Sequence, residues 1–159
     1  MKVNIYIGCD DKQPGLTERW TGVIIQAEGR GRRGEVTDTY SFHATRYVSM
    51  TETIVQVLNK FNRPADITIY MDCTYIVGKL KRFQQKDGTS RSTLDRWQEG
   101  GWTTRRQTPV KNRAEWQRLY NKLRVFEQSG GTFDYAKLDD EEMEGRIEAL
   151  IREGKKNDQ

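Results

Sequence analysis

The feature that most constrains this chain is the order in which the spacing of its apolar residues changes. Apolar and polar residues alternate from Val3 to Ile7, and strand-like segments follow at 20–27 and 36–44. A period of two is typical of strands. Turn-forming residues link the three segments, including the Gly-rich stretch 29–34. Three successive strands with such links predict an antiparallel meander.

The spacing then becomes helical. Met50, Ile54 and Leu58 repeat at intervals of about one helical turn, and the repeat stops before Pro64. A helix therefore follows the meander, and proline ends it because proline has no amide hydrogen to donate.

Five further segments complete the order of elements. A strand at 66–72 and a helix at 74–83 predict a crossover that pairs this strand parallel to the first. After an irregular basic insert come a helix at 116–123, a strand at 132–138 and a helix at 143–151. The pattern predicts an α/β fold, a five-stranded mixed sheet in the order 3-2-1-4-5 with helices on both faces.

The length of 159 residues suits one domain, expected at 1–153 with a flexible tail at 154–159. No apolar run approaches the roughly 20 residues of a membrane-spanning helix, and the first residues lack a signal-peptide core. We expect a cytoplasmic monomer with no membrane partner. Cys9 and Cys73 are too few for a disulfide scaffold, so we expect reduced thiols.

Charge is distributed unevenly along the chain. Residues 79–125 contain 13 Lys and Arg against 4 acids, a net charge of +9, whereas residues 134–152 contain 7 acids against 3 bases. A basic surface attracts phosphate backbones, and clustered carboxylates attract divalent cations. The sequence therefore points to a nucleic acid and to a metal on one small domain.

Three acids fall where this topology brings segments together. Asp10 and Asp72 follow two strands predicted to be parallel neighbours, and Glu52 lies near the start of the first helix. Ligands bind at the carboxyl ends of such strands, and paired carboxylates suit a hard metal ion. Two alternatives stay open: Glu52 forms a capping box with Ser49, or Asp10 and Asp11 are ordinary turn acids.

Four motifs in the same order resemble the type 1 ribonucleases H. They are "IYIGCD" with Asp10, "MTE" with Glu52, "IYMDCTYIV" with Asp72, and "GWTTRRQTPVKNRAEWQRL" at 101–119. The last is the most specific, and the resemblance covers residues 1–153. It implies a ribonuclease H-like fold.

The resemblance also implies an activity. In that family four acids bind two Mg²⁺ ions, for which Mn²⁺ can substitute, and the enzyme hydrolyses the RNA strand of an RNA–DNA hybrid endonucleolytically, producing 5′-phosphomonoesters. Asp10, Glu52 and Asp72 match the first three acids, and Glu144 takes the fourth position.

Two assignments have competitors. A rival register places Gly8 rather than Asp10 at the first acid position and leaves the site one ligand short. The fourth acid has nearby alternatives, namely Asp139, Asp140, Glu141 and Glu142. A non-catalytic nucleic-acid-binding module on the same fold, of phage or mobile-element origin, is therefore the second functional hypothesis.

Contacts to the hybrid are expected on both strands. Readers of the RNA 2′-hydroxyl groups are predicted at Gln13, Cys73 and Thr74. Trp102 is a candidate for stacking on the DNA strand, with a core position as its alternative. The resemblance implies that Asn112 contacts a phosphate of the DNA strand. The candidate phosphate contacts are basic side chains of the insert: Lys79, Lys81, Arg82, Arg105, Arg106 and Lys111.

Overall fold

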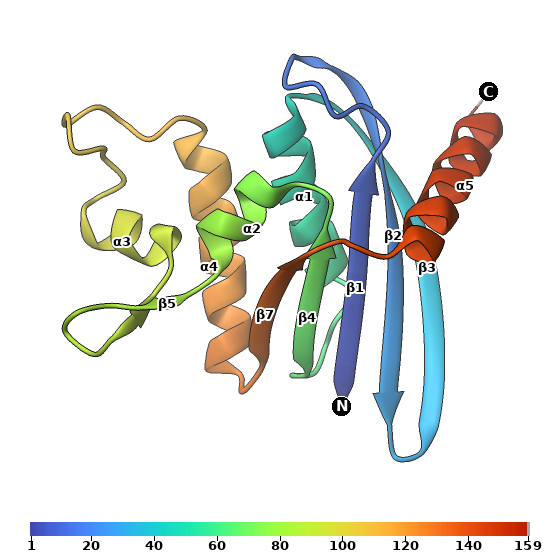
Figure 1. Ribbon diagram of the computed structural model, residues 1–159, viewed down its shortest axis with the longest axis horizontal. Helices are drawn as coiled ribbons and strands as arrows, with labels where there is room; N and C mark the ends of the chain where they lie inside the picture. The colour runs from blue at the N-terminus through green and yellow to red at the C-terminus, as the bar shows by residue number, and fades with distance from the viewer. Residues whose placement is uncertain (159) are drawn as a thin grey trace.

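A computed structural model describes residues 1–158 and contains the predicted sheet (Figure 1). Strands β1 (Lys2–Cys9), β2 (Thr17–Gly29) and β3 (Arg32–Ala44) form the antiparallel meander. Strands β4 (Asp66–Met71) and β7 (Thr132–Lys137) extend the sheet parallel to β1. The order β3-β2-β1-β4-β7 confirms the predicted topology, with β7 as the fifth strand.

Helices cover both faces of this sheet (Figure 1). One core cluster joins the sheet to α1 (Arg46–Leu58), α2 (Thr74–Leu80) and α4 (Arg113–Gln128). A second and smaller cluster lies under α5 (Glu141–Asn157) on the opposite face, where Ile147 and Ile151 are buried. The fold is therefore an α/β layer structure, and α5 alone covers the face that includes Ile24.

The basic insert contains structure that the sequence did not predict. It holds a two-stranded hairpin of β5 (Phe83–Gln84) and β6 (Ser90–Arg91), followed by the short helix α3 (Thr93–Glu99). Ser92 caps α3, because its hydroxyl accepts a hydrogen bond from the Asp95 amide and the Asp95 carboxylate accepts one from the Ser92 amide.

Several helix boundaries differ from expectation. Helix α2 ends at Leu80 rather than at 83, and α4 is longer than the predicted 116–123. Helix α1 begins at Arg46, and its N-cap is Thr45, so the capping box predicted for Ser49 and Glu52 is wrong. Helix α5 continues to Asn157, so residues 154–157 are helical rather than a flexible tail. No helix within residues 1–158 is both long enough and apolar enough to cross a membrane.

Candidate active site

Asp72 is the most buried acid at the predicted site. It follows β4 at the sheet edge where β1 also ends, and its side chain is only 8% exposed. Oδ2 accepts a hydrogen bond from the Cys9 amide at 3.1 Å. Burial raises the pKa of the Asp72 carboxyl, although this amide and two nearby cations oppose the rise.

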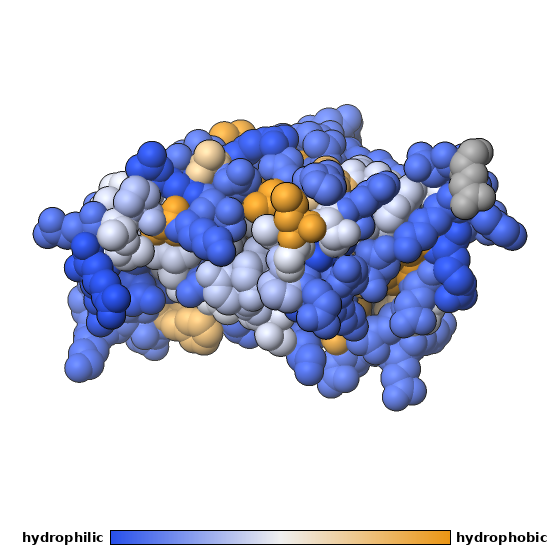
Figure 2. All heavy atoms as spheres, turned by 90° about the horizontal axis from the view of Figure 1, so that it is seen from above, coloured by the Kyte–Doolittle hydropathy of each residue, from blue (hydrophilic) through white to orange (hydrophobic). Residues whose placement is uncertain are grey.

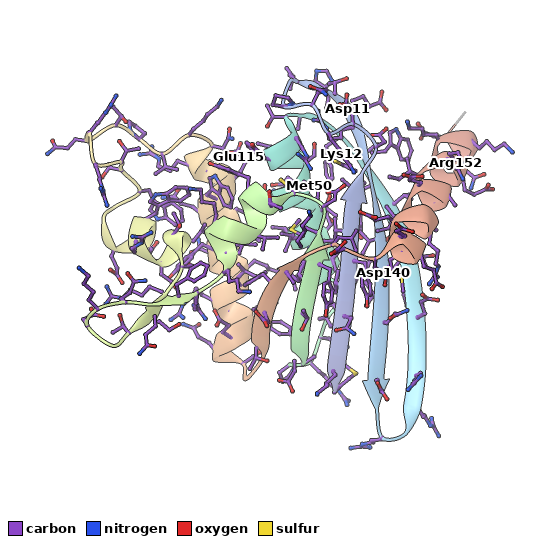
Figure 3. The ribbon with its side chains drawn as sticks, viewed as in Figure 1. Asp11, Lys12, Met50, Glu115, Asp140 and Arg152 are labelled. Atoms are coloured by element: carbon purple, nitrogen blue, oxygen red, sulfur yellow. The ribbon has the colours of Figure 1, made fainter. Side chains whose placement is uncertain are left out.

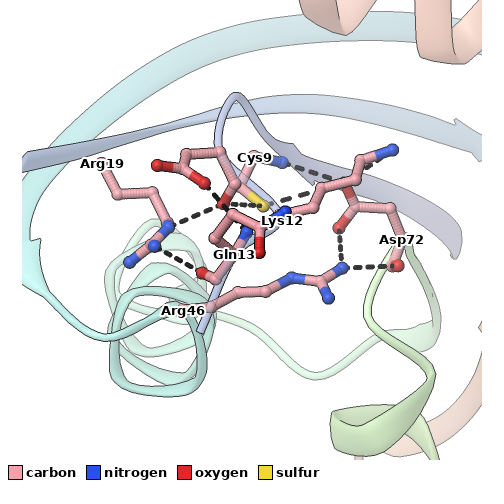
Figure 4. A network of polar contacts seen from close by, with 7 residues as sticks. Cys9, Lys12, Gln13, Arg19, Arg46 and Asp72 are labelled. Carbon is pink, nitrogen blue, oxygen red and sulfur yellow. Dashed lines mark hydrogen bonds and ion pairs between the residues drawn. The ribbon is translucent and has the colours of Figure 1, made fainter. Parts of the chain in front are cut away.

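The two cations near Asp72 belong to the protein itself (Figure 4). Lys12 Nζ lies 3.9 Å from Oδ2, and Arg46 Nη2 lies 3.9 Å from Oδ1. Arg46 Nη2 also donates to the main-chain oxygen of Asp72 at 2.9 Å, which fixes the guanidinium beside the carboxylate. Each carboxylate oxygen therefore faces a positive side chain.

Some buried polar atoms at and near Asp72 have no hydrogen-bond partner among the described residues. Within residues 1–158, three buried side-chain atoms have no hydrogen-bond partner: Asp72 Oδ1, Arg46 Nε and Ser49 Oγ. Ser49 lies about one turn after Arg46 on α1 and is completely buried. Two of the three unpartnered atoms therefore come from the first four residues of α1, and Arg46 is the one that contacts Asp72.

Asp10 lies just beyond β1 and is held by β2 and α5. Its amide donates to the Trp20 oxygen at 3.0 Å, and its Oδ1 accepts from the Trp20 amide at 3.1 Å. Its Oδ2 forms an ion pair with Lys155 Nζ at 2.6 Å. The next acid, Asp11, accepts from the Gln13 amide at 2.9 Å, as the turn-acid alternative predicted for this segment.

Glu52 is directed to a different partner. Both of its carboxylate oxygens lie near Arg118 Nη1 of α4, at 2.7 and 2.6 Å. Glu52 does not line the cavity beside Asp72. The structure therefore separates Glu52 from the acid with which it was predicted to act.

A cavity of about 260 Å³ lies where β1 and β4 end, and α5 forms one of its walls. Asp10, Asp72 and Glu144 line it, together with cations that include Lys12 and Arg152. Figure 3 labels Lys12, in the loop after β1, and Arg152, on α5. Within residues 1–158, no three Asp, Glu, His or Cys side chains lie close enough together to hold a metal ion. The predicted convergence of four carboxylates is therefore not found in the described part of the chain.

Strand register explains the missing carboxylate. Gly8 pairs with Gly22 across β1 and β2. A Cβ atom added at Gly8 would lie 3.3 Å from Asp72 Oδ2 and 3.1 Å from Ile147 Cγ2. Gly8, and not Asp10, is therefore the residue that faces Asp72, as in the rival register that leaves the site one ligand short.

The donor set does not fit a pair of Mg²⁺ ions. Such ions require several oxygen ligands, supplied mainly by carboxylates that are free to coordinate. Here Asp72 is flanked by Lys12 and Arg46, and its neighbouring strand position is Gly8. Positive side chains occupy the surroundings in which a metal would need further negative ligands.

The basic insert supplies several free cations. In the described residues, no ion pair or side-chain hydrogen bond involves Lys81, Arg105, Arg106 or Lys111, and the last three are exposed. The surface seen from above, at the end of the sheet that carries the cavity, is mostly hydrophilic, with small separate apolar patches (Figure 2). These features suit contact with a polyanion.

Two predicted phosphate contacts are occupied within the protein. Arg82 donates to Asp95 Oδ2 at 3.0 Å and forms a two-pronged pair with Glu127 at 2.5 and 3.1 Å, so its assignment as a free phosphate ligand is wrong. Lys79 Nζ lies over the rings of Tyr75 and Trp97, 5.0 and 5.5 Å from their centroids.

Two other predicted contacts are buried. Trp102 is 4% exposed, donates from its indole to Gln98 Oε1 at 2.8 Å and packs against Trp97 and Tyr120, so the core alternative holds. The Cys73 side chain is also buried, which leaves only its main chain for reading a hydroxyl group.

Three further candidates keep positions open to a ligand. Gln13 and Thr74 are exposed on the segments that follow β1 and β4. Asn112 is half-buried, is the residue preceding α4, and has a left-handed backbone with φ of 59°. Their assignment as hybrid contacts stays a prediction.

Arg19 shapes the site, and sequence reasoning missed it. The side chain is completely buried and donates four hydrogen bonds to main-chain oxygens, and Figure 4 shows it beside Gln13, one of the four acceptors. The acceptors are Asp11 at 2.7 Å, Ala44 at 2.6 Å, Gln13 at 2.7 Å and Gly15 at 3.1 Å. One guanidinium thus fixes the loop that carries Lys12. No motif marks Arg19, and the predicted strand at 20–27 left it in the preceding loop, whereas the structure starts β2 at Thr17.

Known proteins resemble this chain in sequence and in fold. A curated protein named Ribonuclease H from Prosthecochloris aestuarii is 30% identical over 104 residues, which cover 65% of this chain and 63% of that relative. No family model matches. The solved LC9-RNase H1, described as a type 1 RNase H with the type 2 active-site motif, superposes with a TM-score of 0.60 at 16% identity, over 86% of this chain and 62% of that chain.

These likenesses support a relationship to the ribonuclease H family. A foamy viral protease–reverse transcriptase, solved in complex with an RNA/DNA hybrid, shares the fold with a TM-score of 0.66 at 11% identity, over 96% of this chain and 20% of that chain. The chain spans 63% and 48% of the length of two curated ribonuclease H relatives. The solved structures show the fold, and the curated relatives support a relationship to the family.

Proposed function

We propose that the chain binds RNA–DNA hybrids through its basic insert and does not hydrolyse them by the two-metal route. The observation that carries the second half of this proposal is the environment of Asp72. Its two carboxylate oxygens face Lys12 and Arg46, while Gly8 supplies no second carboxylate. The ribonuclease H relatives support a hybrid as the ligand.

Binding would rest mainly on the exposed cations. Arg105, Arg106 and Lys111 carry no internal partner in residues 1–158 and lie together in one loop before α4. Lys and Arg contacts to phosphates give affinity that depends on salt and not on sequence. The foamy viral neighbour was solved with an RNA/DNA hybrid, which supports the same class of ligand here.

Discrimination between the strands would require contacts to 2′-hydroxyl groups. Gln13 and Thr74 are exposed beside the end of the sheet and can donate or accept hydrogen bonds there. Arg19 holds the main chain of Gln13 in place. We assign Gln13 and Thr74 to the RNA strand on this ground.

A second candidate function is metal-dependent hydrolysis of the RNA strand. One observation favours it: Asp10, Asp72 and Glu144 line the same cavity. For these acids to gather around Mg²⁺ or Mn²⁺, Asp10 would have to leave Lys155, and Arg46 would have to leave Asp72.

The test uses a labelled RNA–DNA hybrid with Mg²⁺, with Mn²⁺ and with EDTA. We expect an electrophoretic shift in all three conditions and no cleavage product. Cleavage that disappears with EDTA and in Asp72→Asn, but persists in the exposed control Glu153→Gln, would select hydrolysis. Failure to shift the hybrid at low salt, or an equal shift of duplex DNA and duplex RNA, would overturn hybrid binding.

A further inference from the structure

A second group of arginines lies at the opposite end of the sheet from Asp72. The stretch "GRGRRG" at 29–34 forms the turn between β2 and β3, and Arg30, Arg32 and Arg33 come from it. Arg63, in the connection between α1 and β4, joins them around a groove of about 690 Å³. We call this feature the arginine groove.

The arginine groove carries excess positive charge. Glu28 is the one acid among its lining residues, and it lies 3.5 Å from Arg33 in a pair whose side chains are 62% and 84% exposed. Such an exposed pair contributes little. Within residues 1–158, no ion pair or side-chain hydrogen bond involves Arg30, Arg32 or Arg63. Three guanidinium groups thus remain free to bind an anion.

The turn itself is unusual in a way that favours a ligand role for Arg30. Arg30 and Gly31 have φ of 52° and 72°, and Gly29 pairs with Arg32, as in a two-residue hairpin turn. Asn or Gly is the common residue at the first of these positions, because a left-handed backbone costs other residues about 1 kcal/mol. The chain has arginine there although its side chain has no partner within residues 1–158.

Distance separates the arginine groove from the Asp72 cavity. Lys2, the first residue of β1, pairs with Glu28 beside the groove, whereas Cys9, the last residue of β1, lies beside Asp72. At about 3.3 Å per residue, β1 places these two ends roughly 25 Å apart. The groove is therefore a site of its own and not an edge of the cavity.

We propose that the arginine groove binds the phosphate backbone of nucleic acid, as a second site independent of the basic insert. Guanidinium groups match phosphate geometry through two parallel hydrogen bonds, and three unpaired groups around one concave surface can hold successive phosphates. The phosphates come either from a single-stranded extension of the bound hybrid or from another nucleic-acid molecule.

The test compares two variants that each remove three positive charges. The groove variant is Arg30→Asn/Arg32→Thr/Arg63→Gln, in which Asn tolerates the left-handed turn and Thr suits a strand. The insert variant is Arg105→Gln/Arg106→Gln/Lys111→Gln. Fluorescence anisotropy measures the binding of a labelled single-stranded DNA and, separately, of a labelled blunt-ended hybrid.

We expect the groove variant to bind single-stranded DNA at least about tenfold more weakly, with a log–log salt slope reduced by about 2, and to bind the blunt hybrid as the wild type does. The insert variant should show the reverse. If the wild type saturated with blunt hybrid still takes up labelled single strand, the phosphates come from another molecule. If the groove raises the affinity only for a hybrid with a single-stranded extension, the phosphates come from the bound hybrid itself.

Three results would overturn the second site. They are unchanged single-strand binding by the groove variant, an equal loss of both ligands by that variant, and groove-dependent binding to phosphatidylserine-containing vesicles without binding to DNA. A wild type that ignores the hybrid but binds single strands through the groove would refute the proposed function and leave the second site standing. Equal urea-unfolding midpoints for the two variants control for folding.

Discussion

The basic insert and the Asp72 cavity differ in whether their charged side chains are paired within the protein. In the loop before α4, Arg105, Arg106 and Lys111 are exposed and have no internal partner within residues 1–158. At the cavity, Asp72 is flanked by Lys12 and Arg46. The acids Asp10 and Glu52 are likewise paired, with Lys155 and Arg118.

This contrast indicates that nucleic-acid binding and metal-dependent hydrolysis have separate structural requirements on this fold. A surface that holds phosphates needs only unpaired cations on one side of the molecule, and each cation contributes by itself. A pair of metal ions needs several carboxylates from distant segments within a few ångströms. The absence of one carboxylate, as at Gly8, therefore weakens the binding of both metal ions. The loss of one cation lowers the affinity for nucleic acid only in part.

The largest effect is expected at the loop beside the cavity. Arg19→Met should lower the free energy of unfolding by about 3–5 kcal/mol, because it removes a completely buried guanidinium that donates hydrogen bonds to four main-chain oxygens. Urea unfolding measures this loss. Arg33→Met, at a side chain that is 84% exposed, is the control and should change stability by less than about 0.5 kcal/mol. Equal losses in the two variants would show that the burial of Arg19 is unimportant.

The second effect concerns the basic insert. Arg105→Gln/Arg106→Gln/Lys111→Gln should weaken hybrid binding on the order of a hundredfold at low salt and should reduce the log–log salt slope by about 2.7, since each lost phosphate contact removes about 0.9. Anisotropy titrations at several salt concentrations measure both. The arginine-groove variant removes the same charge elsewhere and should leave the hybrid affinity unchanged. If the two variants lost hybrid affinity equally, the effect would come from net charge and not from the position of the cations.

The third effect tests why the cavity lacks a carboxylate. Gly8→Ala should destabilise the protein by about 1–3 kcal/mol, because the new Cβ would lie 3.1 Å from Ile147 Cγ2. In an Ile147→Ala background the same substitution should cost clearly less. A double-mutant cycle by thermal or urea unfolding measures the coupling. If the two losses of stability were additive, contact with Ile147 would not be the reason that position 8 disfavours a side chain.

The smallest effect is a pH dependence at Asp72. Because burial raises its pKa in the folded state above the ordinary value of about 3.9, Asp72 stabilises the fold fully below that value, and the contribution is lost as pH rises through the folded pKa. Asp72→Asn should remove this dependence, so its stability relative to wild type should rise between about pH 4 and pH 7. Urea unfolding across this range measures it, with Asp139→Asn as the exposed control. If the relative stability of Asp72→Asn fell instead, Lys12 and Arg46 would lower the pKa of Asp72 by more than burial raises it.

Much of the fold could be predicted from the sequence because each element carries its own period. The alternation around Val3 and Ile7 and the helical spacing of Ile54 and Leu58 gave the elements, and the short connections gave the strand order. The hairpin at 83–91 and α3 were missed, since both are too short for a periodic signal.

The site was less predictable because it depends on contacts between distant segments. Nothing near Glu52 in the sequence shows that Arg118, 66 residues away, binds it. The register at Gly8 and Asp10 could not be chosen from alternation, since both lie on the same side of β1 in a period of two. Lys12, Arg46 and Ser49 have no recognisable motif, and their importance appears only when β4 is placed beside β1.

The closeness of α5 to Gly8 and Gly22 has a consequence for the side chains that these two positions can accept. Methyl-sized additions at these glycines would meet Ile147 atoms at 3.1 and 3.0 Å. An acidic side chain at position 8 therefore requires Ile147 to shift by a few tenths of an ångström. The size of one side chain on α5 thus sets which residues position 8 can accept without a change in packing.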